Sequence, residues 1–72
     1  MNKYDWIKPG VHAWVAGLVC PVEVEIRYNY HDFKTAWCIC GTLSSAVYKF
    51  DLYQTEAECL EVMRSKAPNL QN

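Results

Sequence analysis

Cysteine has the most versatile chemistry in this 72-residue chain, which contains four: Cys20, Cys38, Cys40 and Cys59. Cys38 and Cys40 lie two positions apart on an expected strand, where both thiols would share one face about 7 Å apart. Structural zinc sites use cysteine pairs separated by about two to four residues. A Cys-ligated zinc site, with His12 or His31 replacing one thiol, is therefore an alternative, and a redox or disulfide role is another. We interpret the thiols as small apolar residues in a reducing compartment and expect no cofactor.

The adjacent residues His31 and Asp32 contain the groups of an acid–base pair. Nucleophilic catalysis also needs a nucleophile beside the base and a third group that orients it. Neighbouring residues on a turn point in different directions, and no glycine-rich elbow accompanies this pair. The segment therefore predicts a hairpin turn, and we expect that the protein is not an enzyme.

Aromatic side chains are abundant, with three Trp, five Tyr and two Phe. In the expected strand 11–16, Trp14 shares a face with His12, opposite Val11, Ala13 and Val15. Either the small residues face the core and Trp14 faces outward, or the reverse holds. Exposed aromatic patches mark protein interfaces. Together with acidic residues on the wet face of the next strand, they predict a partner-binding surface of Tyr4, Trp6, His12, Trp14, Glu23 and Glu25.

Composition and charge narrow the classes of function. The chain is 51% hydrophobic with a net charge of −1, which is typical of a folded domain and not of a disordered segment. Its basic residues are dispersed, so we do not expect nucleic acid as a partner. No apolar run reaches the ~18–20 residues of a membrane span, and no secretory signal is recognisable. We expect a cytoplasmic protein with a protein partner, and self-association through exposed aromatics.

The spacing of hydrophobic residues along the chain predicts its strands and its helix. Apolar and polar residues alternate without exception from Val22 to Tyr30, which indicates a strand with one buried face and one wet face. Thr55 and Glu58 form a capping box before a helical stripe of Cys59, Leu60, Met63 and Ala67. The predicted strands span 11–16, 22–30, 35–40 and 46–50, and the helix spans 56–67.

Short connections between these strands favour antiparallel neighbours. We therefore expect residues 1–72 to form one mainly β domain, a small antiparallel barrel of four to five strands with one C-terminal α-helix. Closing the barrel would remove exposed strand edges.

Four pieces of the sequence, which span roughly residues 8–67, form a familiar pattern: Lys8-Pro9-Gly10, Trp14, the stretch Pro21-Val22-Glu23-Val24-Glu25-Ile26, and Asp51-Leu52-Tyr53-Gln54-Thr55-Glu56-Ala57-Glu58-Cys59. In these pieces the sequence resembles small SH3-like barrel proteins of bacteria and their prophages. Asp-Leu-Tyr-x-Thr is the most specific of the pieces. The family often has acids or a second aromatic between the third and fourth strands, whereas the expected turn 41–45 is short and uncharged.

This resemblance implies the barrel fold and little about activity, because most such proteins have no assigned biochemistry. We expect a non-catalytic protein-interaction module, encoded by a phage or mobile element, that binds and occludes a host protein. The alternatives are a small-molecule binder with an aromatic cage and the zinc-binding module described above.

Overall fold

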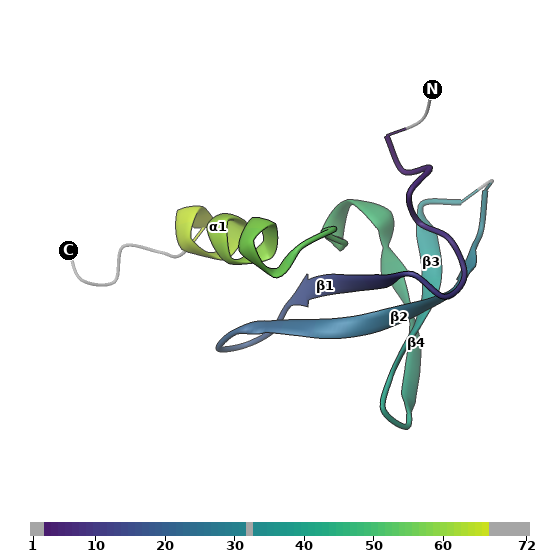
Figure 1. Ribbon diagram of the computed structural model, residues 1–72, viewed down its shortest axis with the longest axis horizontal. Helices are drawn as coiled ribbons and strands as arrows, with labels where there is room; N and C mark the ends of the chain where they lie inside the picture. The colour runs from purple at the N-terminus through teal and green to yellow at the C-terminus, as the bar shows by residue number, and fades with distance from the viewer. Residues whose placement is uncertain (1–2, 32, 67–72) are drawn as a thin grey trace.

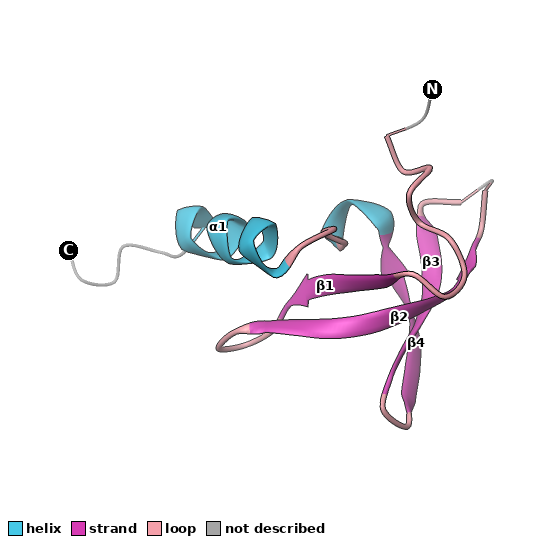
Figure 2. Cartoon of the chain, viewed as in Figure 1, coloured by secondary structure: helices cyan, strands magenta, loops and turns pink. Residues whose placement is uncertain are grey.

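The alternating segment forms the longest strand of the computed structural model, which describes residues 3–31 and 33–66. The elements are β1 (His12–Ala16), β2 (Pro21–Asn29), β3 (Thr35–Cys40), β4 (Leu43–Tyr48), the 3₁₀ helix η1 (Lys49–Asp51) and the helix α1 (Glu56–Lys66) (Figure 2). The strands form one antiparallel sheet in the order β1-β2-β3-β4. The expected mainly β architecture with a C-terminal helix is confirmed.

The sheet bends but does not close into the expected barrel. In Figure 1, β1 and β2 run across the view, whereas β3 and β4 run down it. β1 and β4 do not pair; instead the free edge of β1 carries a single-residue bridge to Tyr53. Trp14 and Tyr53 exchange two N–H···O bonds of 2.9 Å. The bridge ends there because the helix cap at Thr55 follows two residues later, which leaves too few residues for a fifth strand.

The hairpin between β3 and β4 is tighter than expected. The sequence predicted a turn over 41–45 and a strand over 46–50, but Leu43 already pairs with Cys40. Gly41 makes this possible, because its φ of 62° suits the first central position of a two-residue hairpin turn. The fourth strand therefore begins three residues early and ends at Tyr48, directly before η1.

The expected orientation of Tyr28 and Tyr30 is wrong, because β2 contains a β-bulge. Ile26 pairs with Cys38, but Tyr28 pairs with the adjacent Trp37, so Arg27 is an extra residue in β2. One extra residue reverses the alternation that follows. Tyr28 consequently points outward and Asn29 is buried, although strict alternation placed Tyr28 and Tyr30 on the buried face with Ile26.

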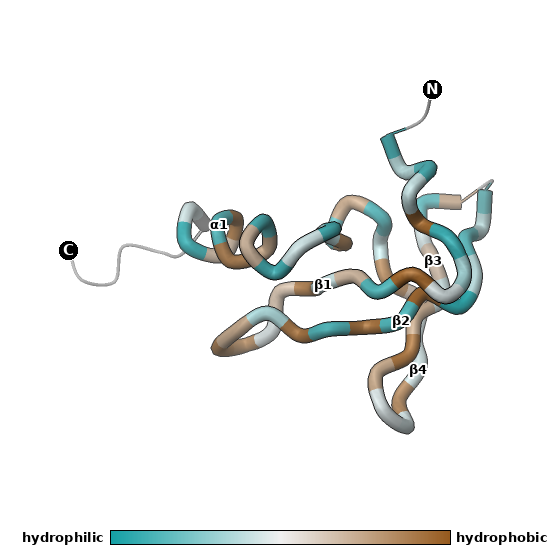
Figure 3. Tube along the Cα trace, viewed as in Figure 1, coloured by the Kyte–Doolittle hydropathy of each residue, from teal (hydrophilic) through white to brown (hydrophobic). Residues whose placement is uncertain are grey.

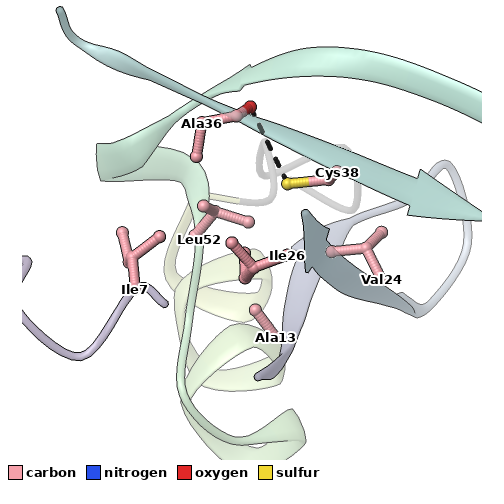
Figure 4. Packing of buried hydrophobic residues seen from close by; sticks show 7 residues of the cluster. All are labelled: Ile7, Ala13, Val24, Ile26, Ala36, Cys38 and Leu52. Atoms are coloured by element: carbon pink, nitrogen blue, oxygen red, sulfur yellow. Dashed lines mark hydrogen bonds between the residues drawn. The ribbon is translucent and has the colours of Figure 1, made fainter. Parts of the chain in front are cut away.

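The core lies on the inner face of the sheet. The core residues that the strands contribute are small or branched. Ile7 and Leu52, which belong to no strand, cover them on the inner face (Figure 4). Hydrophobic and hydrophilic residues alternate along β2 in Figure 3, as a half-buried strand requires. The buried cluster comprises Ile7, Ala13, Val24, Ile26, Ala36, Cys38 and Leu52.

Helix α1 begins at the predicted cap. The Glu58 N–H donates to Thr55 Oγ1 at 3.1 Å, and the Glu58 carboxylate accepts from the Gln54 N–H at 3.1 Å. Cys59 is the one fully buried residue among the described side chains of α1, which packs against β1 and β2. The expected helical residue Ala67 lies outside the described residues.

Candidate interaction surface

The orientation of β1 decides where Trp14 lies. Ala13 is 0% exposed in the core, and Val11 and Val15 pack against that core. His12 is therefore exposed on the outer face, and Trp14 is half-buried on the same face. This is the first of the two orientations that the sequence allowed.

Four of the six predicted partner-binding residues share this outer face. The register places His12 opposite Glu25 and Trp14 opposite Glu23, and directly paired residues point to the same side of a sheet. His12 Nδ1 lies 3.0 Å from Glu23 Oε2, and Arg27 contacts Glu25 at 3.5 Å. Because these polar side chains contact one another and are largely exposed, they form a polar end of the outer face.

Tyr4 and Trp6, the other two predicted residues, lie elsewhere. Both are half-buried and pack against the core cluster beside Ile7. They help the N-terminal segment to cover the inner face of the sheet. The structure therefore separates them from His12 and Trp14.

A larger aromatic surface lies on the outer face of β2, β3 and β4. Tyr28 pairs with Trp37 across the β2–β3 ladder, and Trp37 pairs with Ala46 of β4. Tyr48 follows two residues after Ala46 on the same side. The exposed fractions are 53% for Tyr28, 37% for Trp37, 52% for Tyr48 and 56% for Phe50. We call this surface the aromatic face and define it by Tyr28, Tyr30, Phe33, Trp37, Tyr48 and Phe50.

Ring contacts hold the aromatic face in place. Tyr28 and Tyr30 meet edge to face with ring centroids 4.8 Å apart, and Tyr30 and Phe33 do so at 6.4 Å. Tyr48 and Phe50 are stacked at 5.0 Å. Such contacts restrict the rotamers of the rings, so less conformational entropy is lost when they bind a partner.

A buried lysine supports one end of this face. The Lys49 Nζ donates to the backbone carbonyl of Tyr30 at 2.9 Å, which ties η1 to the connection between β2 and β3. Lys49 thereby fixes the segment that carries Phe50. Next to it lies a cavity of about 330 Å³ whose lining includes Tyr4, Phe33, Lys49 and Phe50.

Sequence reasoning missed the aromatic face because of the β2 bulge. Tyr28 and Tyr30 were placed on the buried face by the uninterrupted alternation of 22–30. The sequence signal for a bulge was absent, since no glycine or proline interrupts 22–30.

The cysteines do not form a common cluster. Cys20 and Cys40 are exposed, whereas Cys38 lies in the sheet core and Cys59 is the buried residue of α1. Within residues 3–31 and 33–66, no three His, Cys, Asp or Glu side chains are close enough to hold a metal ion.

Burial raises the pKa of the Cys38 thiol. Burial, together with the charge of Glu56, also raises the pKa of Cys59. Both buried thiols therefore stay protonated and unreactive.

A cavity of about 810 Å³ lies between α1 and the inner side of the sheet. Its apolar lining includes Val15, Val47, Leu60 and Met63. Leu18 in the β1–β2 connection also borders it and is fully exposed. The cavity exists because Cys59 is the only described residue of α1 that is buried.

No family model, curated protein or solved structure matches this chain. Among the described residues, none of the helices has the length and apolar character needed to cross a bilayer.

Proposed function

We propose that this protein is a non-catalytic interaction module that binds another protein through the aromatic face. The single observation that carries this proposal is the pair of contacting ring groups, Tyr28-Tyr30-Phe33 and Tyr48-Phe50, that accompany the partly exposed Trp37 on the aromatic face. Tyr and Trp are enriched in binding hot spots because they bury a large area with few rotatable bonds.

The surroundings of the aromatic face favour a protein partner. Ala46 and Ser44 lie beside Trp37 and Ile39 on the outer face, so the surface between the rings is small and uncharged. The hydrogen-bonded side chains of His12 and Glu23 lie at the far end, on β1 and β2. An apolar centre with a polar margin is the usual composition of a protein interface.

Two features support the proposed relation to SH3-like barrels. The bridge between Trp14 and Tyr53 brings the segment after β4 to the free edge of β1, as a barrel would require. The bulge between Ile26 and Tyr28 bends β2 between its two neighbours. This relation is the basis for proposing a phage- or prophage-encoded protein that occludes a host protein.

Affinity capture from a cleared lysate of the source organism tests the proposal. The probes are the wild-type chain, the variant Tyr28→Ser with Tyr48→Ser, and the control His12→Ala with Glu23→Ala on the polar end. We expect one protein to be retained by wild type and control and to fall at least about tenfold with the aromatic variant. Circular dichroism establishes that all three chains are folded.

Two outcomes would contradict the proposal. In one, the wild type retains nothing above the bare matrix. In the other, the retained protein is unaffected by loss of both tyrosines.

The cavity beside Phe50 favours a second candidate function, binding of a small aromatic or apolar molecule. Its walls include Tyr4, Phe33 and Phe50, and its volume of about 330 Å³ lies in the range of small-molecule sites. A metabolite panel screened by thermal shift tests this candidate. A compound that raises the melting temperature of wild type but not of Phe33→Ala supports it, and a panel without any shift counts against it.

A further inference from the structure

The outer edge of β4 carries unpaired backbone groups. β4 ends the sheet, so only its β3 side is paired. The Lys49 N–H donates to the Lys34 carbonyl at 2.8 Å, which identifies these directly opposed residues as a hydrogen-bonded pair. Hydrogen-bonded and non-bonded pairs alternate along an antiparallel ladder. The backbone N–H groups of Ser44, Ala46 and Tyr48 therefore point away from β3.

This edge lacks the features that usually protect an exposed strand. From Gly41 to Tyr48 there is no charged residue and no proline, and β4 pairs with β3 without a bulge. Nearly all of its side chains are exposed. An edge of this kind is a template for pairing with another strand.

The opposite edge of the sheet is different. Trp14 of β1 is bridged to Tyr53, and α1 packs against β1. Among the described residues, β4 is therefore the sheet's more accessible edge. A protein with one such edge forms a closed pair, whereas two would allow an open-ended fibre.

We propose that β4 pairs antiparallel with β4 of a second copy of this chain, around a two-fold axis at Ala46. In this register the Ala46 N–H donates to the Ala46 carbonyl of the second copy. The Tyr48 N–H donates to the Ser44 carbonyl of the second copy, and the symmetry repeats both bonds.

In this register, the side chains of β4 fit against those of β4 in the second copy. Ser44, Ala46 and Tyr48 all lie on the outer face, and directly opposed residues share a face. The small Ser44 would therefore lie beside the Tyr48 ring of the second copy, while Ala46 meets itself without a clash. No like charges meet, because the strand has none and the whole chain carries only −1. The aromatic faces of the two copies would become one continuous surface.

Two charge variants test the proposed axis. A residue on a two-fold axis meets its own copy, so Ala46→Lys and Ala46→Glu each place like charges together. We expect wild type at micromolar concentration to sediment at twice the 8.3 kDa of one chain, and each variant as a monomer. An equimolar mixture of the two variants restores the dimer at low salt, because opposite charges then face each other.

Amide hydrogen exchange gives a second measurement. In the wild-type dimer the amides of Ala46 and Tyr48 are protected, and in Ala46→Lys they exchange fast. The amides of Ser45 and Val47 face β3, so they stay protected in both chains and show that the variant is folded. Ala46→Pro removes only an outward N–H and also yields a monomer.

Several results would overturn the proposed dimer: a wild-type chain that is monomeric at micromolar concentration, variants that remain dimeric, or a mixture that stays monomeric. The proposal is separable from partner binding by the aromatic face. Tyr28 lies on β2, two strands from the edge, so Tyr28→Ser weakens partner capture and leaves the dimer intact.

Discussion

Asn29 shows how one residue connects distant parts of this chain. It is only 7% exposed, and its Nδ2 donates to the Ile7 carbonyl at 2.9 Å. This bond holds the N-terminal segment against the sheet, so Ile7 can cover the core. Within the described part of the chain, the Asn29 Oδ1 is buried without a partner, which is a cost that the bulge imposes.

Thiol labelling tests the placement of the four cysteines at the scale of single residues. In the folded protein, we expect Cys20 and Cys40 to react rapidly with an aromatic disulfide reagent at mildly alkaline pH. Cys38 and Cys59 are buried and have raised pKa values, so they react only after unfolding. Titration in denaturant provides the control, with all four thiols reacting. Rapid native reaction of a third thiol would show that the core or α1 is placed incorrectly.

At the scale of elements, the stability of α1 depends on its N-terminal cap, because the helix buries few of its side chains. Cys59 is its one fully buried side chain among the described residues, while Leu60 and Met63 border the large cavity. A helix with little tertiary packing depends more on its terminal hydrogen bonds. Thr55 supplies one of these bonds, to the Glu58 N–H.

Replacing this cap has a measurable effect on stability. Thr55→Ala leaves the Glu58 N–H without its side-chain acceptor, and we expect a loss of about 1 kcal/mol in the free energy of unfolding. Denaturant titration followed by circular dichroism measures the change. Thr55→Ser keeps a hydroxyl at the cap and should lie close to wild type. If Thr55→Ala and Thr55→Ser were equally stable, the cap would contribute nothing.

At the scale of the whole molecule, a one-sheet core makes stability sensitive to individual buried groups. The core has one strand layer, covered by Ile7, Leu52 and the half-buried Tyr4 and Trp6. A chain of this length has a free energy of unfolding of roughly 4–11 kcal/mol. Burying even one charged group would therefore remove a large part of it.

Alkaline pH provides a test at this scale. Burial raises the pKa of Cys38 and Cys59 above the ordinary 9.0. Burial also raises the pKa of Tyr53 above 10.0, with help from the charge of Asp51. The unfolded chain thus releases these protons at lower pH than the folded chain does. The stability that these three groups contribute is therefore fully present below pH 9.0, and it decreases as pH rises through their raised pKa values.

Thermal unfolding from neutral to alkaline pH measures this decrease. The variant Cys38→Ala lacks one of the shifted groups, so its melting temperature should depend less on pH although it is lower throughout. A melting temperature that does not change across this range would show that the thiols are not buried.

Local residue patterns determined much of this protein's secondary structure. Alternation in 22–26 marked β2 up to the bulge, the strand 35–40 was predicted with its observed bounds, and Thr55 and Glu58 marked the helix start. The predicted site was divided, with His12 and Trp14 on the outer face and Tyr4 and Trp6 against the core. Only the tertiary structure decided the bulge at Arg27, the early start of β4 and the open sheet. These features depend on which residues of separate strands pair, and pairing is a property of two segments that neither segment's own pattern contains.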